Sequence, residues 1–337
     1  MSKTDIKALA KELGLSPSTV SRALRDSHEI SQSTKDRVKV LADKLNYQPH
    51  PYASSLRKSN SKTIGIIVPE VANNFFAQVF NGIEMQAQES GYHALIYLTH
   101  ESYEKEVSVL NHLQRGRVDG VIMSLSANTK NFDHIAALTD AGIPVVFFDR
   151  VAESISTAKI TTDDFESSYK ATEHLIKQGC KRIAQLTSTL YLSTTKRRKE
   201  GFLAACSKHG LPTDSELIAE CSNYEEAEIK TRQLLQSKQR PDAIFSAVEK
   251  LSLVPYKICK QLNIKIPSQL KLIGYSNMEA ASVLEPSLTT INQPAFEIGK
   301  EAATILLRGL EKRKIHVPNE NIILPAEIIV RESTATV

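Results

Sequence analysis

Residues 9–22 read LAKELGLSPSTVSR, and this stretch decides the fold of the N-terminal segment. Leu9 and Leu13 recur at helical spacing, and Gly14 is the residue type that ends a helix in the left-handed conformation. Ser16-Pro17 is a common start of a new helix, because serine caps it and proline fits its first turn. The stretch therefore predicts two short helices joined by a tight glycine turn.

The flanking sequence adds the ends of this helical unit. Asp5 is placed to cap the first helix, and a third helix is expected from Gln32 to Asn46 with Ser31 as its N-cap. This is a helix-turn-helix pattern, in which the N-terminal end of the second helix enters the DNA major groove. Spacing alone also allows a generic three-helix bundle with solvated serines and arginines.

Charge is distributed unevenly along the chain. Residues 1–62 contain 12 Lys and Arg against 6 Asp and Glu, a net charge of +6, whereas the remainder contains 30 against 32. A basic head on a nearly neutral body favours contact with a polyanion, although a solvated basic face would look the same. On the second helix, Ser18 allows close approach to DNA, and Arg22 can reach guanine with both ends of its fork.

The rest of the composition narrows the class of protein. Hydrophobic residues make up 41% and charged residues 24%, which is ordinary for a globular protein. The four cysteines and nine histidines are scattered without metal-ligand spacing, so no structural metal is expected. No apolar run approaches the roughly 20 residues of a membrane helix, and no signal-peptide core follows Met1. We therefore expect a cytoplasmic protein with no membrane contact.

Beyond residue 61, short apolar runs alternate with helical segments. The expected strands lie at 62–69, 92–97, 119–123 and 143–149, with a helix at 76–91 between the first two. This alternation is typical of a doubly wound, parallel α/β sheet.

An internal repeat predicts two such lobes. Three residues recur at an identical offset of 119, namely Ile64, Gly82 and Gly91 at Ile183, Gly201 and Gly210. Two similar α/β lobes form a cleft at the carboxyl ends of their strands, where open sheets bind ligands. The sequence thus predicts an all-α head followed by two doubly wound lobes with a ligand site between them.

Taken together, the motifs of the chain resemble the LacI/GalR family of transcription regulators. The stretches that carry the resemblance are Gly14-Leu15-Ser16, Thr19-Val20-Ser21-Arg22, Asn46-Tyr47-Gln48-Pro49, Ala53-Ser54-Ser55-Leu56, Thr162-Asp163-Asp164, Pro241-Asp242-Ala243-Ile244-Phe245, Leu288-Thr289-Thr290-Ile291-Asn292-Gln293-Pro294 and Arg331-Glu332-Ser333. The resemblance implies a helix-turn-helix domain at 1–49, a hinge helix and linker at 50–61, and a periplasmic-binding-protein-like domain at 62–337. Its N-lobe is expected at 62–161 plus 292–322, and its C-lobe at 162–291 plus 323–337.

For DNA, the resemblance implies that Leu56 wedges into the minor groove while Ala53 packs against the partner's hinge helix. His50 departs from the asparagine usual in the family. The residues expected at the DNA are Ser16, Pro17, Ser18, Ser21, Arg22, Arg25, Tyr47, Ala53, Leu56 and Arg57.

For the cleft, the resemblance and the strand ends predict a small-molecule effector site and no cofactor. The expected contacts are Phe75, Asp149, Arg150, Asp163, Thr194, Arg198, Tyr224, Glu249, Ser276 and Asn277. Two departures remove side chains that hold sugar hydroxyls in relatives, because Ala247-Val248-Glu249 replaces Ala-Asn-Asp and Ser276 replaces an aspartate. An effector with an acidic group is the hypothesis, since Arg150 and Arg198 remain while one carboxylate is lost.

These features predict a homodimeric transcription regulator, expected to be a repressor, that binds a palindromic operator under allosteric control by a sugar or sugar derivative. The C-terminal residues show no leucine heptads, which favours a dimer over a coiled-coil tetramer. An enzyme is disfavoured because no nucleophile elbow, phosphate loop or dinucleotide fingerprint follows an expected strand. A transport binding protein would share the lobes but lack the basic head.

Overall fold

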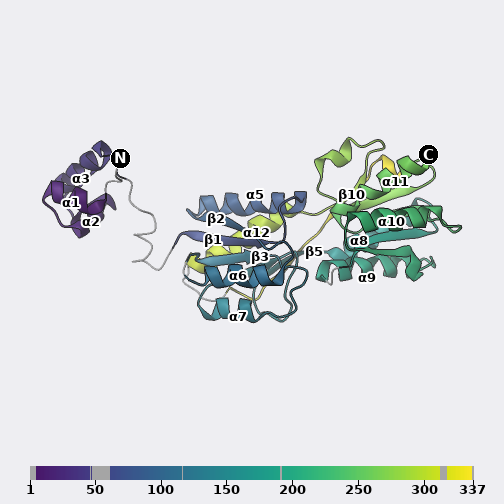
Figure 1. The fold of residues 1–337 in the computed structure, drawn as a ribbon, viewed down its shortest axis with the longest axis horizontal. Helices are drawn as coiled ribbons and strands as arrows, with labels where there is room; N and C mark the ends of the chain where they lie inside the picture. Colours follow the sequence, from purple (N-terminus) through teal and green to yellow (C-terminus); the bar gives the residue numbers. More distant parts are fainter. Residues whose placement is uncertain are drawn as a thin grey trace. The chain divides into compact units, whose positions relative to one another are not determined.

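The computed structural model describes residues 5–45, 47, 61–115, 117–189, 192–311 and 317–335. The chain divides into two compact units, Met1–Ser61 and Lys62–Val337. Figure 1 shows the small helical unit and the larger α/β unit.

Helices α1 (Ile6–Leu13), α2 (Pro17–Leu24) and α3 (Gln32–Lys44) form the described part of the first unit. Gly14 ends α1 with φ 66° and ψ 29°, the left-handed conformation that glycine adopts without strain. Ser16 and Ser31 cap α2 and α3 by accepting hydrogen bonds from the backbone N–H of Thr19 and Thr34, the third residue of each helix. The small core contains Leu9, Ala10, Val20, Ala23, Val38 and Ala42.

The first lobe of the larger unit is a six-stranded sheet in the order β11-β5-β4-β3-β1-β2, parallel throughout. Its strands are β1 (Thr63–Val68), β2 (His93–Leu98), β3 (Gly120–Met123), β4 (Val145–Phe148), β5 (Lys159–Thr162) and β11 (Asn321–Leu324). Buried residues of α5 (Asn74–Glu89) and α12 (Ala295–Glu311) share one core cluster, whereas those of α6 (Tyr103–Leu113) and α7 (Asp133–Asp140) share another, so the sheet is covered on both faces.

The second lobe repeats this plan in the order β12-β10-β9-β8-β6-β7. Its strands are β6 (Ile183–Ser188), β7 (Ile218–Cys221), β8 (Ala243–Ser246), β9 (Lys271–Tyr275), β10 (Thr289–Asn292) and β12 (Glu327–Ile329), of which β12 alone pairs antiparallel. Helices α8 (Asp164–Lys177) and α9 (Ser193–Lys208) cover one face, and α10 (Tyr224–Gln236) and α11 (Val254–Leu262) the other. Short 3₁₀ turns η1 (Ser215–Leu217), η2 (Glu249–Leu251), η3 (Glu279–Ser282) and η4 (Glu332–Thr334) complete it. The predicted fold class is confirmed.

Within the described ranges the chain crosses between the lobes directly after β5, β10 and β11. The lobe boundaries expected at 161, 291 and 322 fall one or two residues inside these strands. Pairing explains the difference, because Leu324 still lies beside Thr162 in the first sheet.

The repeated glycines mark equivalent close contacts between helices. A Cβ on Gly82 would lie 2.1 Å from the carbonyl oxygen of Phe296 on α12, and one on Gly201 would lie 2.2 Å from that of Phe165 on α8. Gly91 and Gly210 both adopt positive φ, 69° and 67°, just beyond the ends of α5 and α9. The repeat therefore reflects two copies of one packing arrangement.

We predict that Gly82→Ala lowers the free energy of unfolding of the larger unit by about 1–3 kcal/mol, because the new methyl group forces α5 and α12 apart. Gly309→Ala on α12 is the matched control, since its nearest contact would be an ordinary 3.6 Å and alanine favours a helix by about 0.8 kcal/mol. Urea unfolding of both variants measures the difference, and equal stability of the two would contradict the close contact.

Candidate functional site

The exposed face of α2 carries most of the side chains expected at DNA. Pro17, Arg22 and Arg25 are exposed, and Ser18 and Ser21 are half-buried, while Val20 and Ala23 fill the core. The hydroxyl of Ser16 lies 2.7 Å from that of Ser18 and 2.8 Å from that of Thr19. The start of α2 thus presents a compact hydroxyl cluster of the size that can approach a base edge.

Both arginines of α2 are held by neighbouring groups. Arg22 donates from Nη1 to Glu29 Oε2 at 2.8 Å, with both side chains about half exposed. Arg25 donates to the backbone oxygen and the hydroxyl of Ser21 at 3.0 and 2.9 Å. Because the Arg22–Glu29 ion pair is exposed to solvent, breaking it costs little free energy. Arg22 can therefore leave Glu29 to contact a DNA base.

Tyr47 packs against the core of the helical unit, and partial burial raises the pKa of its hydroxyl group. Ala53, Leu56 and Arg57, together with the rest of the expected hinge helix, lie outside the described residues.

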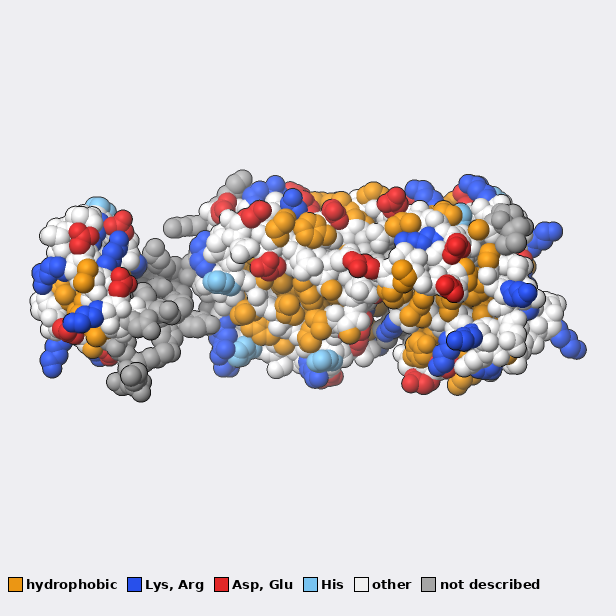
Figure 2. Space-filling model, turned by 90° about the horizontal axis from the view of Figure 1, so that it is seen from above, with side chains coloured by type: hydrophobic (Ala, Val, Ile, Leu, Met, Phe, Trp, Pro, Cys, Tyr) orange, Lys and Arg blue, Asp and Glu red, His pale blue; other side chains and the backbone are white. Residues whose placement is uncertain are grey.

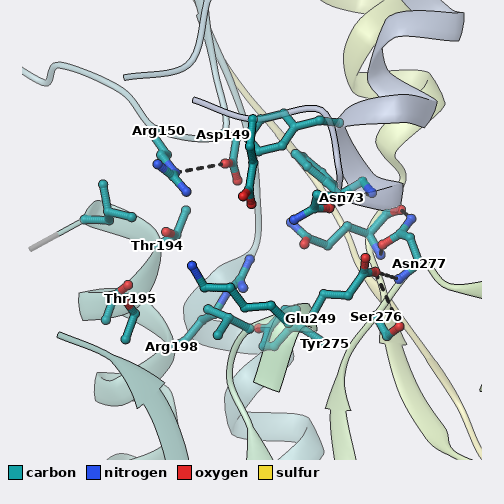
Figure 3. A pocket seen from close by; sticks show the side chains of 18 residues that line it. Asn73, Asp149, Arg150, Thr194, Thr195, Arg198, Glu249, Tyr275, Ser276 and Asn277 are labelled. Atoms are coloured by element: carbon teal, nitrogen blue, oxygen red, sulfur yellow. Dashed lines mark hydrogen bonds and ion pairs between the residues drawn. The ribbon is translucent and has the colours of Figure 1, made fainter. Parts of the chain in front are cut away.

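A pocket with about 650 Å³ of empty space, part of it open to solvent, lies between the two lobes. It is lined by Glu70, Asn73, Phe75, Phe76, Asp149, Arg150, Ser188, Leu192, Thr194, Thr195, Arg198, Val248, Glu249, Lys250, Tyr275, Ser276, Asn277 and Gln293. Figure 3 shows Asp149 and Arg150 of the first lobe facing Thr194 and Arg198 of the second. Eight of the ten side chains expected at an effector therefore converge here.

Arg198 is the most completely fixed of these side chains. It is 5% exposed, and its Nε donates to Asp164 Oδ1 at 2.6 Å while its Nη1 donates to the carbonyl of Ala247 at 2.8 Å. Its guanidinium carbon lies 3.7 Å from the ring centre of Tyr275. These contacts use only part of the five-donor fork, and Nη2 makes no hydrogen bond within the described residues.

Asp149 follows β4 and faces Arg198 across the pocket. Its backbone is held at φ 56°, a conformation rare outside glycine, and the residue is 9% exposed. Burial raises the pKa of its carboxyl group, although Arg150 and Arg198 oppose the shift. Apart from an ion pair with Arg150 Nε at 3.8 Å, the carboxylate has no hydrogen bond to the described residues.

The two arginines are less available than the sequence suggested. Arg150 donates from Nη1 to both carboxylate oxygens of Glu101 at 2.9 Å, and Arg198 is paired with Asp164. Glu70, Asp149 and Glu249 add negative charge to the lining, and Lys250 adds a positive charge. Both arginines that motivated the hypothesis of an acidic effector therefore have carboxylate partners, whereas Lys250, which also lines the pocket, has no ion pair among the described residues.

Asp163 and Tyr224 do not line this pocket. Asp163 precedes α8 and accepts a hydrogen bond from the backbone N–H of Ala326 at 2.8 Å, which ties two crossing segments together. Tyr224 begins α10, is 40% exposed, and lies under Lys257, whose Nζ is 5.4 Å from its ring centre.

Ten residues that line the pocket were not expected there from the sequence, among them Asn73, Phe76 and Tyr275. Asn73 caps α5 through Phe75 N at 2.8 Å, and Phe76 packs edge-to-face on Phe75 with ring centres 5.4 Å apart. An asparagine before an apolar run is a helix-start signal and could have identified the first of these.

The fold and these two surfaces define a class of protein: a helix-turn-helix unit joined to a two-lobed ligand-binding unit. Residues 5–50 match the model for bacterial regulatory proteins of the lacI family, and residues 61–328 match that for periplasmic binding proteins and the sugar-binding domain of the LacI family. The chain belongs to the LacI family, and it is a transcription regulator rather than an enzyme.

Relatives match over nearly the whole chain. The HTH-type transcriptional repressor PurR of Vibrio atlanticus is 32% identical, covering 91% of this chain and 92% of its own. The HTH-type transcriptional repressor CytR of Escherichia coli is 29% identical, covering 98% and 96%. A lac repressor dimer bound to operator and the anti-inducer ONPF matches the fold with a TM-score of 0.85 at 21% identity, over 98% and 99% of the two chains.

No described helix has the length and apolar character needed to span a bilayer. Likewise, no cluster of three or more histidine, cysteine or acidic side chains arranged to hold a metal occurs in the part of the chain that the structure describes.

We predict that Arg198→Met destabilises the larger unit by about 3–5 kcal/mol at pH 8, because it leaves buried Asp164 without its counter-charge. Burial already raises the pKa of Asp164 to about 6, and Arg198 is the group that limits this rise. Removing Arg198 raises that pKa further, so the penalty is largest where the carboxyl group must ionise and shrinks below pH 6, where it is protonated in either protein.

The control is Lys196→Met on the same helix, since Lys196 makes an exposed 3.9 Å pair with Glu200 that is worth at most about 1 kcal/mol. Urea unfolding at pH 8 and pH 5.5 measures both variants. A loss for Arg198→Met that does not depend on pH would contradict the assigned pair.

Proposed function

We propose that the chain is a homodimeric repressor whose affinity for a palindromic operator is controlled by a neutral, hydroxyl-rich effector bound between the lobes. The observation that carries the effector assignment is the facing of Asp149 and Arg198 across the pocket. A hydroxyl group can donate to the first and accept from the second at the same time.

The pairing of the two arginines and the unbonded carboxylate of Asp149 support a neutral effector over an acidic one. Each pocket arginine already has a carboxylate partner at 2.6–2.9 Å. The carboxylate of Asp149, by contrast, accepts no hydrogen bond from any described residue. An anionic ligand would meet this desolvated carboxylate, whereas a hydroxyl group would relieve it. Phe75 and Phe76 supply the apolar wall on which a sugar ring packs.

Solved relatives agree with this class of ligand. A transcriptional regulator CelR was solved as a cellobiose complex (24% identity, TM-score 0.73, 98% and 99% of the two chains), and a LacI family regulator from Enterococcus faecium with bound ribose (27% identity, TM-score 0.72, 82% and 99%). Both ligands are neutral sugars.

A thermal-shift panel of neutral sugars, nucleosides and sugar acids at 10 mM is expected to give stabilisation by a neutral, hydroxylated compound, since binding only the native state raises its stability. Asp149→Asn should weaken that compound about 10–100-fold, because a hydrogen bond to a charged acceptor is lost. Stabilisation by sugar acids alone would contradict the neutral assignment.

Dimerisation follows from the expected symmetry of the operator. Exposed hydrophobic residues occur in both lobes, including Ile96 (48% exposed) on edge strand β2 and Val283 (77%) after η3. Figure 2 shows hydrophobic side chains gathered over both lobes on one face of the larger unit. We infer that a second copy covers such residues, which would also bring two α2 helices to one DNA site.

Selection of genomic fragments by the purified full-length chain at about 150 mM salt tests the DNA assignment, because nonspecific phosphate binding is weakened there. A palindrome is the expected result.

Arg22→Ala should then reduce the binding free energy for that palindrome by about 1–3 kcal/mol and relax the base preference at one position in each half-site. The control Lys39→Ala, an exposed change on α3, should leave the base preference unchanged; a uniform loss for Arg22→Ala would contradict its role in base reading.

A further inference from the structure

The carboxylate of Glu249 connects the two lobes. Glu249 belongs to the second lobe, in η2 after β8, while Asn74 begins α5 in the first lobe. Its Oε1 accepts hydrogen bonds from the backbone N–H and the side-chain amide of Asn74, at 3.1 and 2.9 Å. Its Oε2 accepts from the backbone N–H of Asn277 at 2.7 Å and the hydroxyl of Ser276 at 3.4 Å. Oε1 therefore bonds to the first lobe and Oε2 to the second; Figure 3 shows the contacts of Glu249 with Ser276 and Asn277.

A second bridge runs beside the first and continues to the crossing segments. The side-chain amide of Asn277 donates to Gln78 Oε1 at 2.9 Å, across the lobes, and to the carbonyl of Gln293 at 2.7 Å. Gln293 in turn donates from Nε2 to Thr162 Oγ1 at 2.9 Å, joining the first two crossings. The contacts of Glu249 are thus linked to the point where the lobes hinge.

The chemistry of these bonds favours a firm connection. Hydrogen bonds to a carboxylate are about twice as strong as neutral ones, and a negative charge at the N-terminus of a 16-residue helix is further stabilised by its unpaired N–H groups. In a two-lobed protein, a ligand that contacts both lobes ordinarily supplies the energy of closure. Here side chains of the protein make the same kind of bridge.

We propose that Glu249 is a positioning residue that closes the cleft without an effector, so that the effector binds a pocket already assembled. The regulatory meaning rests on the proposed function, but the closure itself does not. The population of the closed form sets the apparent affinity for any ligand of that form, so Glu249 strengthens effector binding through Asn74 and Asn277 without needing to touch the effector.

Glutamine at this position discriminates the proposal from a simple packing role. Both oxygens of Glu249 accept from N–H donors on opposite lobes, whereas an amide offers one acceptor and one NH₂ group. Glu249→Gln keeps the volume but places a donor against the N–H of either Asn74 or Asn277, so it should weaken the bridge, whereas Glu249→Ala should remove it. Glu225→Gln, an exposed change on α10, is the matched control.

Hydrogen–deuterium exchange of the full-length, effector-free chain reads the bridge directly. The Asn74 N–H is the first of α5 and has no acceptor within the helix, so its protection reports contact with the other lobe. Glu249→Gln is expected to speed exchange about tenfold or more at Asn74 and Asn277 while leaving β1 and β8 unchanged. Unchanged rates at both amides, or unprotected amides in the parent protein, would overturn the proposal.

A spin-label distance measurement tests closure itself, between labels on Lys105→Cys in α6 and Lys196→Cys in α9, both exposed positions on opposite lobes. The native cysteines are buried with pKa values raised to about 11 or 12, so labelling selects the introduced thiols. Glu249→Gln should lengthen and broaden the interlobe distance. An unchanged distance would overturn the proposal even if exchange at Asn74 increased. Neither readout uses an effector or an operator, so failure to find either ligand leaves the result intact.

Discussion

The larger unit depends on three segments in which the chain crosses from one sheet to the other. Because β5, β10 and β11 each end at the same boundary, the lobes can rotate relative to one another only about these segments. The crossings are joined to one another by the Gln293–Thr162 and Asp163–Ala326 hydrogen bonds. The pocket lies between the lobes beside this boundary. A ligand bound there contacts both lobes close to the segments about which they rotate.

Electrostatics at the boundary follow from burial. Arg198 enters the protein interior with Asp164, the carbonyl of Ala247 and the ring of Tyr275 as partners, which fixes its direction before any ligand arrives. Asp149 lies opposite with a desolvated carboxylate. Under the proposed function, Arg198 and Asp149 act as a preorganised donor and acceptor pair, and selectivity is expected to come from hydroxyl geometry instead of net charge.

Local signals in the sequence predicted the elements well, because capping and packing are properties of neighbouring residues. Gly14, Ser16 and Ser31 mark helix ends through backbone geometry, and Gly82 and Gly201 mark helix contacts that admit no Cβ. The resemblance to known regulators and the strand ends supplied eight of the eighteen residues that line the pocket.

What the sequence could not supply are the partners of each charge. Glu101 lies 49 residues before Arg150, and Asn74 lies 175 residues before Glu249, so neither pair has a local pattern. Without those partners, Arg150 looked like a free cation, and the contacts of Glu249 with the other lobe were not foreseen. Tyr224 and Asp163 were misplaced for the same reason, since strand-end position does not reveal which way a side chain turns.

Under the proposed function, one small molecule and one DNA site are energetically coupled through the lobes. The most direct test is a reciprocal titration with the full-length chain, measuring the operator dissociation constant at increasing effector concentration and the effector dissociation constant with and without operator. Coupling requires that both constants change by the same factor, typically about 5–150-fold. Operator affinity that stays constant at saturating effector would contradict the account.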